Sequence, residues 1–275
     1  IFNELVHEAL GYLELIQVNA TGLATLDVLT SFAVVAQKNK YARPVLHEGD
    51  AIEIIAGRHP VIEMSLAAGE EYVPNDVFLD HETQQIMMIT GPNMSGKSAL
   101  LRQTALICLM AQMGCFVPAD TAKLGLVDKV FTRVGASDNI SSGESTFMVE
   151  MNETANILRN ASHQSLVIMD EVGRGTSTFD GLSLAWAAAT YLADNIGCMT
   201  LFATHYFEMT ALGDQNPHCN NLHLGATEVD DRVYFLHRVQ SGPASKSYGL
   251  HVAALAGVPS EVCQAAKHKL IALES

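Results

Sequence analysis

The feature that most constrains this chain is a glycine-rich octapeptide between a short apolar stretch and a helical pattern. Residues Gly91-Pro92-Asn93-Met94-Ser95-Gly96-Lys97-Ser98 match the template G-x-x-x-x-G-K-S/T at every position. The pattern at 85–90 is typical of a buried strand entering the loop, and that at 99–113 of a helix leaving it. Loop amides and the helix N-terminus then attract phosphate, which predicts a nucleoside triphosphate site.

Two side chains of this loop have expected tasks in such a site. Lys97 is expected to contact the β- and γ-phosphates, and the Ser98 hydroxyl to ligate Mg²⁺. The alternative is a chance glycine-rich turn. The strand and helix patterns on either side of the loop argue against that alternative.

Composition limits the partners and the compartment. The 275 residues carry a formal net charge of −14, which opposes a broad electrostatic contact with nucleic acid by this part alone. The five cysteines form no C-x-x-C pair, so we expect free thiols and a cytoplasmic location. No signal peptide pattern is present, and Gln112 cuts the apolar run near the loop, which predicts no membrane span. Residues 1–3 lack Met and start inside a helical pattern, so we expect a fragment.

Strand and helix patterns alternate along most of the chain. Strand patterns lie at 51–55, 84–90, 165–169 and 199–204, a half-exposed edge strand at 232–239, and helical patterns at 99–113, 146–161 and 182–195. This order predicts an α/β fold with a central parallel or mixed sheet flanked by helices. We expect three regions, a helical segment at 1–43, the α/β domain at 44–250 and a pair of short helices at 251–275.

An acidic pair follows the most apolar strand pattern. Asp170 and Glu171 come directly after residues 165–169. Carboxylates at the carboxyl end of a central strand lie beside the phosphate loop, so we expect Asp170 to bind Mg²⁺ and Glu171 to deprotonate the attacking water. The alternative is an acidic pair that begins a solvated turn. The buried strand before it favours the catalytic interpretation.

Two further positions have a structural and a functional interpretation. His205 ends the strand pattern at 201–205 and is either an ordinary histidine or a sensor of the γ-phosphate. Ser145 precedes a helical pattern and is either an ordinary N-cap or part of an anion site at a helix N-terminus. The sequence alone leaves open whether that anion site serves its own nucleotide or one on a partner.

A zinc site at residues 218–223 is the less favoured interpretation of that segment. His218, Cys219 and His223 are three ligand types at irregular spacing, whereas zinc sites have regular spacing and a fourth ligand. We therefore expect a solvated loop there.

Taken together, these motifs resemble the C-terminal ATPase region of the MutS DNA mismatch-repair family, a relative of the ABC-type ATPases. The resemblance covers nearly the whole chain. Besides the phosphate loop and residues 170–181, it is carried by E-I-I-A-G-R-H-P at 53–60, S-T-F-M-V-E-M at 145–151, A-T-H-Y-F at 203–207 and A-S-K-S-Y-G at 244–249. It implies a P-loop NTPase of ABC type that hydrolyses ATP to ADP with Mg²⁺.

The resemblance also implies roles for residues that their local patterns do not assign. Asn93 helps to hold the nucleotide, Tyr72 stacks on adenine, and His237 lies near the base. Two ATPase domains pair so that Ser145 reaches the nucleotide of the opposite subunit, and the helices after residue 250 form a dimerising helix-turn-helix. In the family, ATP controls mismatch binding and sliding-clamp formation, which implies mismatched double-stranded DNA and a MutL-type protein as partners.

Two positions depart from the family pattern. Ala99 stands where a threonine is usual and removes a hydroxyl near the α-phosphate, and Glu144 places an anion near the γ-phosphate site in trans. Losing one charge-assisted hydrogen bond at Ala99 weakens nucleotide binding by roughly 1–3 kcal/mol in our hypothesis. These departures keep open a nucleotide-gated dimerisation module with little turnover. A different ABC-type machine is disfavoured by the strings after Ser145 and Asp170.

Overall fold

The computed structural model describes residues 1–67, 69–135, 145–229, 232–244 and 248–274. Its helices are α1 (Phe2–Leu10), α2 (Leu13–Asn39), α3 (Pro60–Ser65), α4 (Lys97–Gln112), α5 (Thr146–Asn160), α6 (Thr178–Tyr191), the π-helix η2 (Leu192–Ile196), the 3₁₀-helix η3 (Phe207–Thr210), α7 (Ala211–Gln215), α8 (Gly249–Leu255) and α9 (Ser260–Glu274). Its strands are β1 (Val45–His47), β2 (Ile52–Gly57), β3 (Asn75–Leu79), β4 (Ile86–Thr90), β5 (Thr121–Gly125), β6 (Val130–Val134), β7 (Leu166–Asp170), β8 (Met199–Ala203), β9 (Cys219–Val229) and β10 (Arg232–Ser241).

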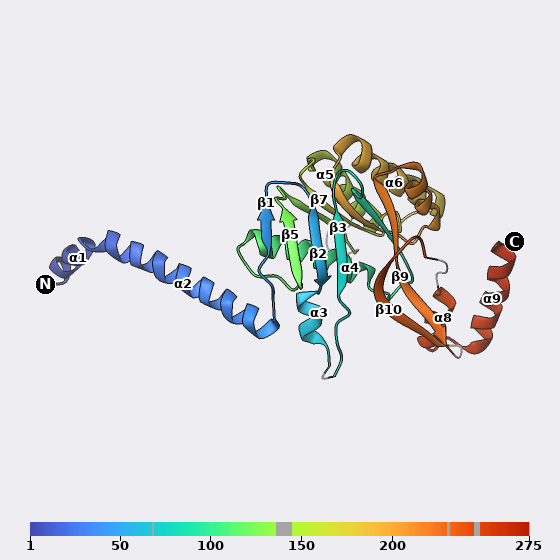
Figure 1. Cartoon of the computed structure of the whole chain (residues 1–275), viewed down its shortest axis with the longest axis horizontal. Helices are drawn as coiled ribbons and strands as arrows, with labels where there is room; N and C mark the ends of the chain where they lie inside the picture. Colours follow the sequence, from blue (N-terminus) through green and yellow to red (C-terminus); the bar gives the residue numbers. More distant parts are fainter. Residues whose placement is uncertain (68, 136–144, 230–231, 245–247, 275) are drawn as a thin grey trace.

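The strands form two sheets (Figure 1). The larger sheet has six strands in the order β10-β9-β4-β8-β7-β6, all parallel except β10, which pairs antiparallel with β9. The predicted α/β class and mixed central sheet are therefore confirmed. The smaller sheet, with the order β1-β5-β2-β3, was not predicted.

Helix α4 lies between the two sheets and joins them into one core. Its apolar residues pack with those of β2 and β3 on one side and of β4, β7 and β8 on the other. Helices α5 and α6 cover the opposite face of the larger sheet, where Phe202 and Met169 are fully buried. Residues 86–89 of β4 are all apolar because alternate side chains enter both cores, Met87 the first and Met88 the second.

The N-terminal helices lie apart from this core. Helix α2 extends away from both sheets (Figure 1), and no residue of α1 or α2 is buried. Within the described ranges, α2 alone is long and apolar enough to cross a membrane, with a mean hydropathy of 1.5 in its most apolar window. Helices that pack inside longer proteins also meet this criterion, so the finding assigns no location to α2. The apolar run that ends at Gln112 is α4, a core helix.

The C-terminal residues form the two helices that the sequence predicts. Helix α8 ends at Leu255 and α9 begins at Ser260, with Gly257 in the left-handed conformation between them. Their apolar side chains are largely exposed, Val262 and Ile271 among them. The pair therefore offers apolar surface that the described part of the chain does not cover.

Candidate functional site

The glycine-rich loop joins the carboxyl end of β4 to the first residue of α4, as the sequence predicts. Gly91 has φ of 137°, and a Cβ placed there would lie 2.7 Å from the Leu224 carbonyl oxygen, so only glycine fits. Ser95 and Lys97 are buried within the loop, whereas Asn93 and Met94 are exposed. The loop thus packs against β9 and presents its tip outward.

Lys97 lies at the centre of the site. Its Nζ donates to the carbonyl oxygens of Gly91 at 2.8 Å and Pro92 at 3.1 Å, and lies 3.7 Å from Oε1 of Glu171. Burial lowers the pKa of Lys97, and the carboxylates of Glu171 and Asp170 act in the opposite direction. The ammonium group is therefore a buried cation held between the loop and the acidic pair.

Asp170 ends β7, the neighbour of β8 in the larger sheet, and lies beside the start of α4. Only 6% of the residue is exposed, and its Oδ1 atom is buried without a hydrogen-bond partner in the described residues. Burial raises the pKa of Asp170, while a hydrogen bond from the Ser98 side chain lowers it. The two residues predicted to hold a metal ion are thus brought together.

Glu171 has a strained backbone and two cationic neighbours. Its φ of 59° lies in the left-handed region, which side chains without special support rarely adopt. Its amide donates to the Ala203 carbonyl at 2.9 Å, which fixes this conformation against β8. The carboxylate lies 2.6 Å from Nη1 of Arg174 as well as near Lys97. Strained residues cluster at functional sites, so the conformation itself marks Glu171.

A buried ion pair supports the segment after Glu171. Arg133 on β6 lies 3.2 Å from Glu150 on α5, and both side chains are 4% exposed. The other carboxylate oxygen of Glu150 accepts a short hydrogen bond from the Gly173 amide. The Tyr206 hydroxyl donates to the Gly173 carbonyl at 2.9 Å. The amide and the carbonyl of Gly173 are therefore both held by buried side chains, Glu150 on α5 and Tyr206 after β8.

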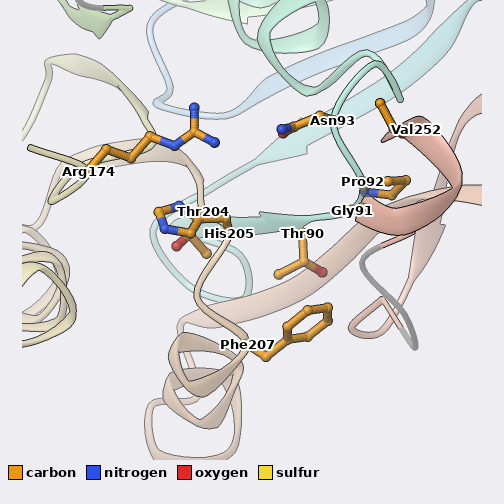
Figure 2. Close-up of a pocket in the computed structure, with 10 residues that line it drawn as sticks. Thr90, Gly91, Pro92, Asn93, Arg174, Thr204, His205, Phe207 and Val252 are labelled. Carbon is orange, nitrogen blue, oxygen red and sulfur yellow. The ribbon is translucent and has the colours of Figure 1, made fainter. Parts of the chain in front are cut away.

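His205 faces the loop across a pocket of about 330 Å³. Figure 2 shows its ring near the Arg174 guanidinium, with Asn93 across the pocket. Partial burial lowers the pKa of His205, and the cation of Arg174 adds to this effect, while Glu171 opposes it. The imidazole is therefore predominantly neutral near pH 7 and able to accept or donate one hydrogen bond.

A second pocket of about 320 Å³ lies beside the acidic pair, on the side of Ser98 and Arg102. It is lined by Ser98, Arg102, Arg133, Gly135, Thr146, Glu150, Asp170, Glu171, Arg174 and Gly175. Arg174 lines both pockets. Ser145 caps α5 by accepting from the Met148 amide at 3.2 Å, so the N-cap interpretation is confirmed, and the residue is exposed. Its action in trans stays a prediction.

The residues expected near the nucleotide base lie at different distances from the loop. Nδ1 of His237 is 2.9 Å from the Ser95 carbonyl oxygen, so His237 does adjoin the loop. Buried Asn75 holds this bulge of β10 through the His237 carbonyl and the Val239 amide, both at 2.8 Å. Tyr72 instead donates to Gln103 on α4 at 3.0 Å, and burial raises its pKa to about 12.

The expectation of a solvated loop at 218–223 is wrong. Cys219 is buried and begins β9. Residues 219–223 pair in parallel with residues 86–90 of β4, so their backbone is hydrogen-bonded within the sheet and not to solvent. His218 instead contacts the Glu82 carbonyl and His223 the Gly242 carbonyl, so the alternative zinc interpretation is not supported either. The predicted free thiols are confirmed for all five cysteines. Glu144 lies outside the described residues.

Some site residues were not identified from the sequence. Arg133 lies within β6 and Asn75 begins β3, two strands that the sequence analysis does not predict, and only the burial of their polar groups distinguishes these residues. Arg174 lies in the segment 170–181, which carries the family resemblance without a role assigned to this residue. The arginine three residues after Glu171 is the signal that could have indicated the ion pair between them.

These features define an α/β protein that gathers a glycine-rich loop, two carboxylates and several cationic side chains at the carboxyl edge of a parallel sheet. A family model described as MutS domain V matches residues 87–274. The chain therefore belongs to the MutS family.

Curated relatives support this assignment over the full length of the chain. Proteins named DNA mismatch repair protein MutS are 54% identical in Phocaeicola vulgatus, 54% in Parabacteroides distasonis and 53% in Bacteroides fragilis. Each alignment covers 100% of this chain and 32% of the relative. The chain thus spans about a third of the length of these relatives.

Proposed function

We propose that this chain is a P-loop ATPase of ABC type, and the ATP-hydrolysing part of a mismatch-recognition protein. One observation carries the proposal. Asp170 has a buried oxygen without a partner, and it lies at the carboxyl edge of the sheet beside Ser98 and Lys97. A buried carboxylate oxygen is stable when a cation completes its contacts, and hard divalent cations prefer such oxygen ligands.

The residues of this site fit a magnesium ion. Ser98 and Asp170 would hold the ion, which would neutralise charge on the phosphates of bound ATP. The N–H groups of loop residues 91 and 93–96 and the N-terminus of α4 would bind the phosphates together with Lys97. When ATP binds, the Lys97 ammonium group would exchange its contacts with the Gly91 and Pro92 carbonyl oxygens for contacts with phosphate oxygens, which bind a cation more strongly.

Hydrolysis requires a base, and Glu171 is the carboxylate in position. In the proposal Glu171 takes the proton of the attacking water, Arg174 orients its carboxylate, and His205 contacts the γ-phosphate. Asn93, Ala99, Tyr72 and His237 belong to the nucleotide side by the family resemblance. For His237 the contact with Ser95 supports this role, whereas Tyr72 would have to exchange its contact with Gln103.

The wider assembly is part of the same proposal. Exposed Ser145 would contact the nucleotide of a second copy, and the apolar surface of α8 and α9 would pair two chains. The relatives are named for DNA mismatch repair, so mismatched DNA, a MutL-type protein and the bacterial cytoplasm are the proposed partners and location. The net charge of −14 favours DNA contact by other parts of the protein.

The direct test of nucleotide binding is Lys97→Met. We expect it to weaken ATP binding about tenfold to a hundredfold, since it removes charge-assisted hydrogen bonds worth about 1.5–3 kcal/mol. A titration with a fluorescent ATP analogue in Mg²⁺ buffer measures this. Lys123→Met is the matched control, because Lys123 is 60% exposed and pairs with Glu53 on the smaller sheet. Equal affinity in the two variants contradicts the proposed site.

A nucleotide-gated dimerisation module with little turnover is the second candidate. It is favoured by the contacts of Glu171, whose carboxylate is engaged by both Arg174 and Lys97. ATPase rate per chain, measured against protein concentration, separates the two candidates. We expect the rate to rise as dimers form, and Ser145→Ala to lower the rate of the dimer. A rate near zero at every concentration, with ATP-dependent dimers, would favour the module instead.

A further inference from the structure

Three loops lie together at the amino ends of the parallel strands of the larger sheet, opposite to the carboxyl ends where the glycine-rich loop lies. Asp50 precedes β2, His81 lies between β3 and β4, and His163 precedes β7. One potential ligand atom from each residue lies within 4.8 Å of those from the other two. The two imidazole rings stack with centroids 3.8 Å apart and an angle of 22° between their planes. The nucleotide site uses none of these residues.

His81 carries the most informative observation. Both of its ring nitrogens are buried, and neither forms a hydrogen bond of normal length and angle within the described part of the chain, although the Gly197 main chain lies near the ring. Buried polar atoms are nearly always satisfied, so such a ring points to a bound group.

The loops that carry the cluster are held in place by their own contacts. The Asp80 carboxylate accepts from the amides of Thr83 at 2.6 Å and Gln84 at 2.8 Å, which fixes the turn around His81. The hydroxyls of Ser162 and Ser165 both donate to Asp128 at 2.7 Å, which fixes the loop around His163.

Space for the His163 ring depends on a glycine. Gly197 has φ of 71°, and a Cβ there would lie 3.1 Å from Cδ2 of His163. The side chains of Asp50 and His163 are exposed, whereas that of His81 is partly buried. The cluster therefore combines one partly buried ligand with two exposed ones.

We propose that Asp50, His81 and His163 bind one divalent transition-metal ion of the zinc class. Two imidazoles and a carboxylate suit Zn²⁺, with water completing a tetrahedral site, and are a poor match for Mg²⁺, which prefers oxygen ligands. Ligand atoms around a tetrahedral zinc lie about 3.4 Å apart, so closing the site requires the exposed His163 ring to rotate out of its stack on His81 and Asp50 to approach. The ion would link three loops: the one before β2 of the smaller sheet, the one that joins β3 to β4 of the larger sheet, and the one before β7.

Zinc titration against a competing chelator dye, in buffer with excess Mg²⁺, tests the proposal. We expect one saturable site per wild-type chain. His163→Phe keeps an aromatic ring beside His81 but no ligand nitrogen, and Asp50→Asn keeps the shape but not the charge. Each is expected to weaken zinc binding at least about tenfold. Glu82→Gln is the matched control, because it is an exposed carboxylate next to His81 outside the cluster, and its affinity should be unchanged.

Thermal unfolding provides a second readout that also reports folding. Without zinc, the His163→Phe and Asp50→Asn chains should unfold cooperatively near the wild-type temperature. Added zinc should raise the unfolding temperature of the wild type and of Glu82→Gln only, and EDTA should reverse the change. The proposal is overturned if the wild type has no saturable zinc site. It is equally overturned if all variants bind zinc alike, since binding would then lie elsewhere.

Discussion

Replacing Glu171 by glutamine is expected to lower ATP hydrolysis about 10²- to 10⁴-fold, the range that a general base contributes. The amide keeps the size of the side chain but cannot accept the proton of water. ATP binding should be retained or strengthened, because Lys97 loses its ionic contact with the Glu171 carboxylate at 3.7 Å and is released toward phosphate. Single-turnover hydrolysis together with equilibrium ATP titration measures both effects.

The control for this experiment is a second carboxylate near the same pocket. Glu208→Gln removes an exposed charge that acts on the His205 pKa but has no contact with Lys97 or Arg174 in the described residues. Its hydrolysis rate should stay within about twofold of the wild type, as expected for an exposed surface charge. If Glu171→Gln hydrolyses ATP as fast as Glu208→Gln, the base has been assigned to the wrong residue.

The sequence predicts those parts of the fold whose pattern lies within one contiguous run of residues. Strands β4, β7 and β8 are recognisable because each is mostly apolar, as strands buried on both faces are, with one polar residue apiece. The smaller sheet escapes prediction because β1 pairs with β5, with Val45 beside Lys123. Pairing between strands so distant in the chain leaves no local pattern, and the short exposed β1 offers little hydrophobic signal.

The same reason separates predicted from unpredicted site residues. The loop, Asp170 and Glu171 are predictable because the strand that positions them immediately precedes them. The ion pair between Arg133 and Glu150 is not predictable, because its partners lie on β6 and α5. The sequence alone also does not distinguish a buried charged residue from an exposed one. Ser145 as an N-cap is predictable because capping is local, whereas its contact with a partner is a property of two chains.

Replacing Glu150 by alanine is expected to be the most destabilising of these changes, by about 3–5 kcal/mol. The substitution leaves Arg133 buried with an uncompensated charge and removes the acceptor of the Gly173 amide. Urea unfolding followed by fluorescence or circular dichroism measures the loss. Because Gly173 anchors the segment that begins at Glu171, hydrolysis should fall even in chains that remain folded.

Glu153 on the same helix provides the matched comparison for Glu150. Its carboxylate lies 3.3 Å from Nε of Arg133 but is 44% exposed, so Glu153→Ala should lose no more than about 1 kcal/mol. Arg133→Met combined with Glu150→Leu should lose less than the sum of the single substitutions, since no lone charge remains buried. If Glu150→Ala and Glu153→Ala unfold alike, the buried pair does not hold the catalytic segment, and the support for Glu171 must come from the Ala203 contact instead.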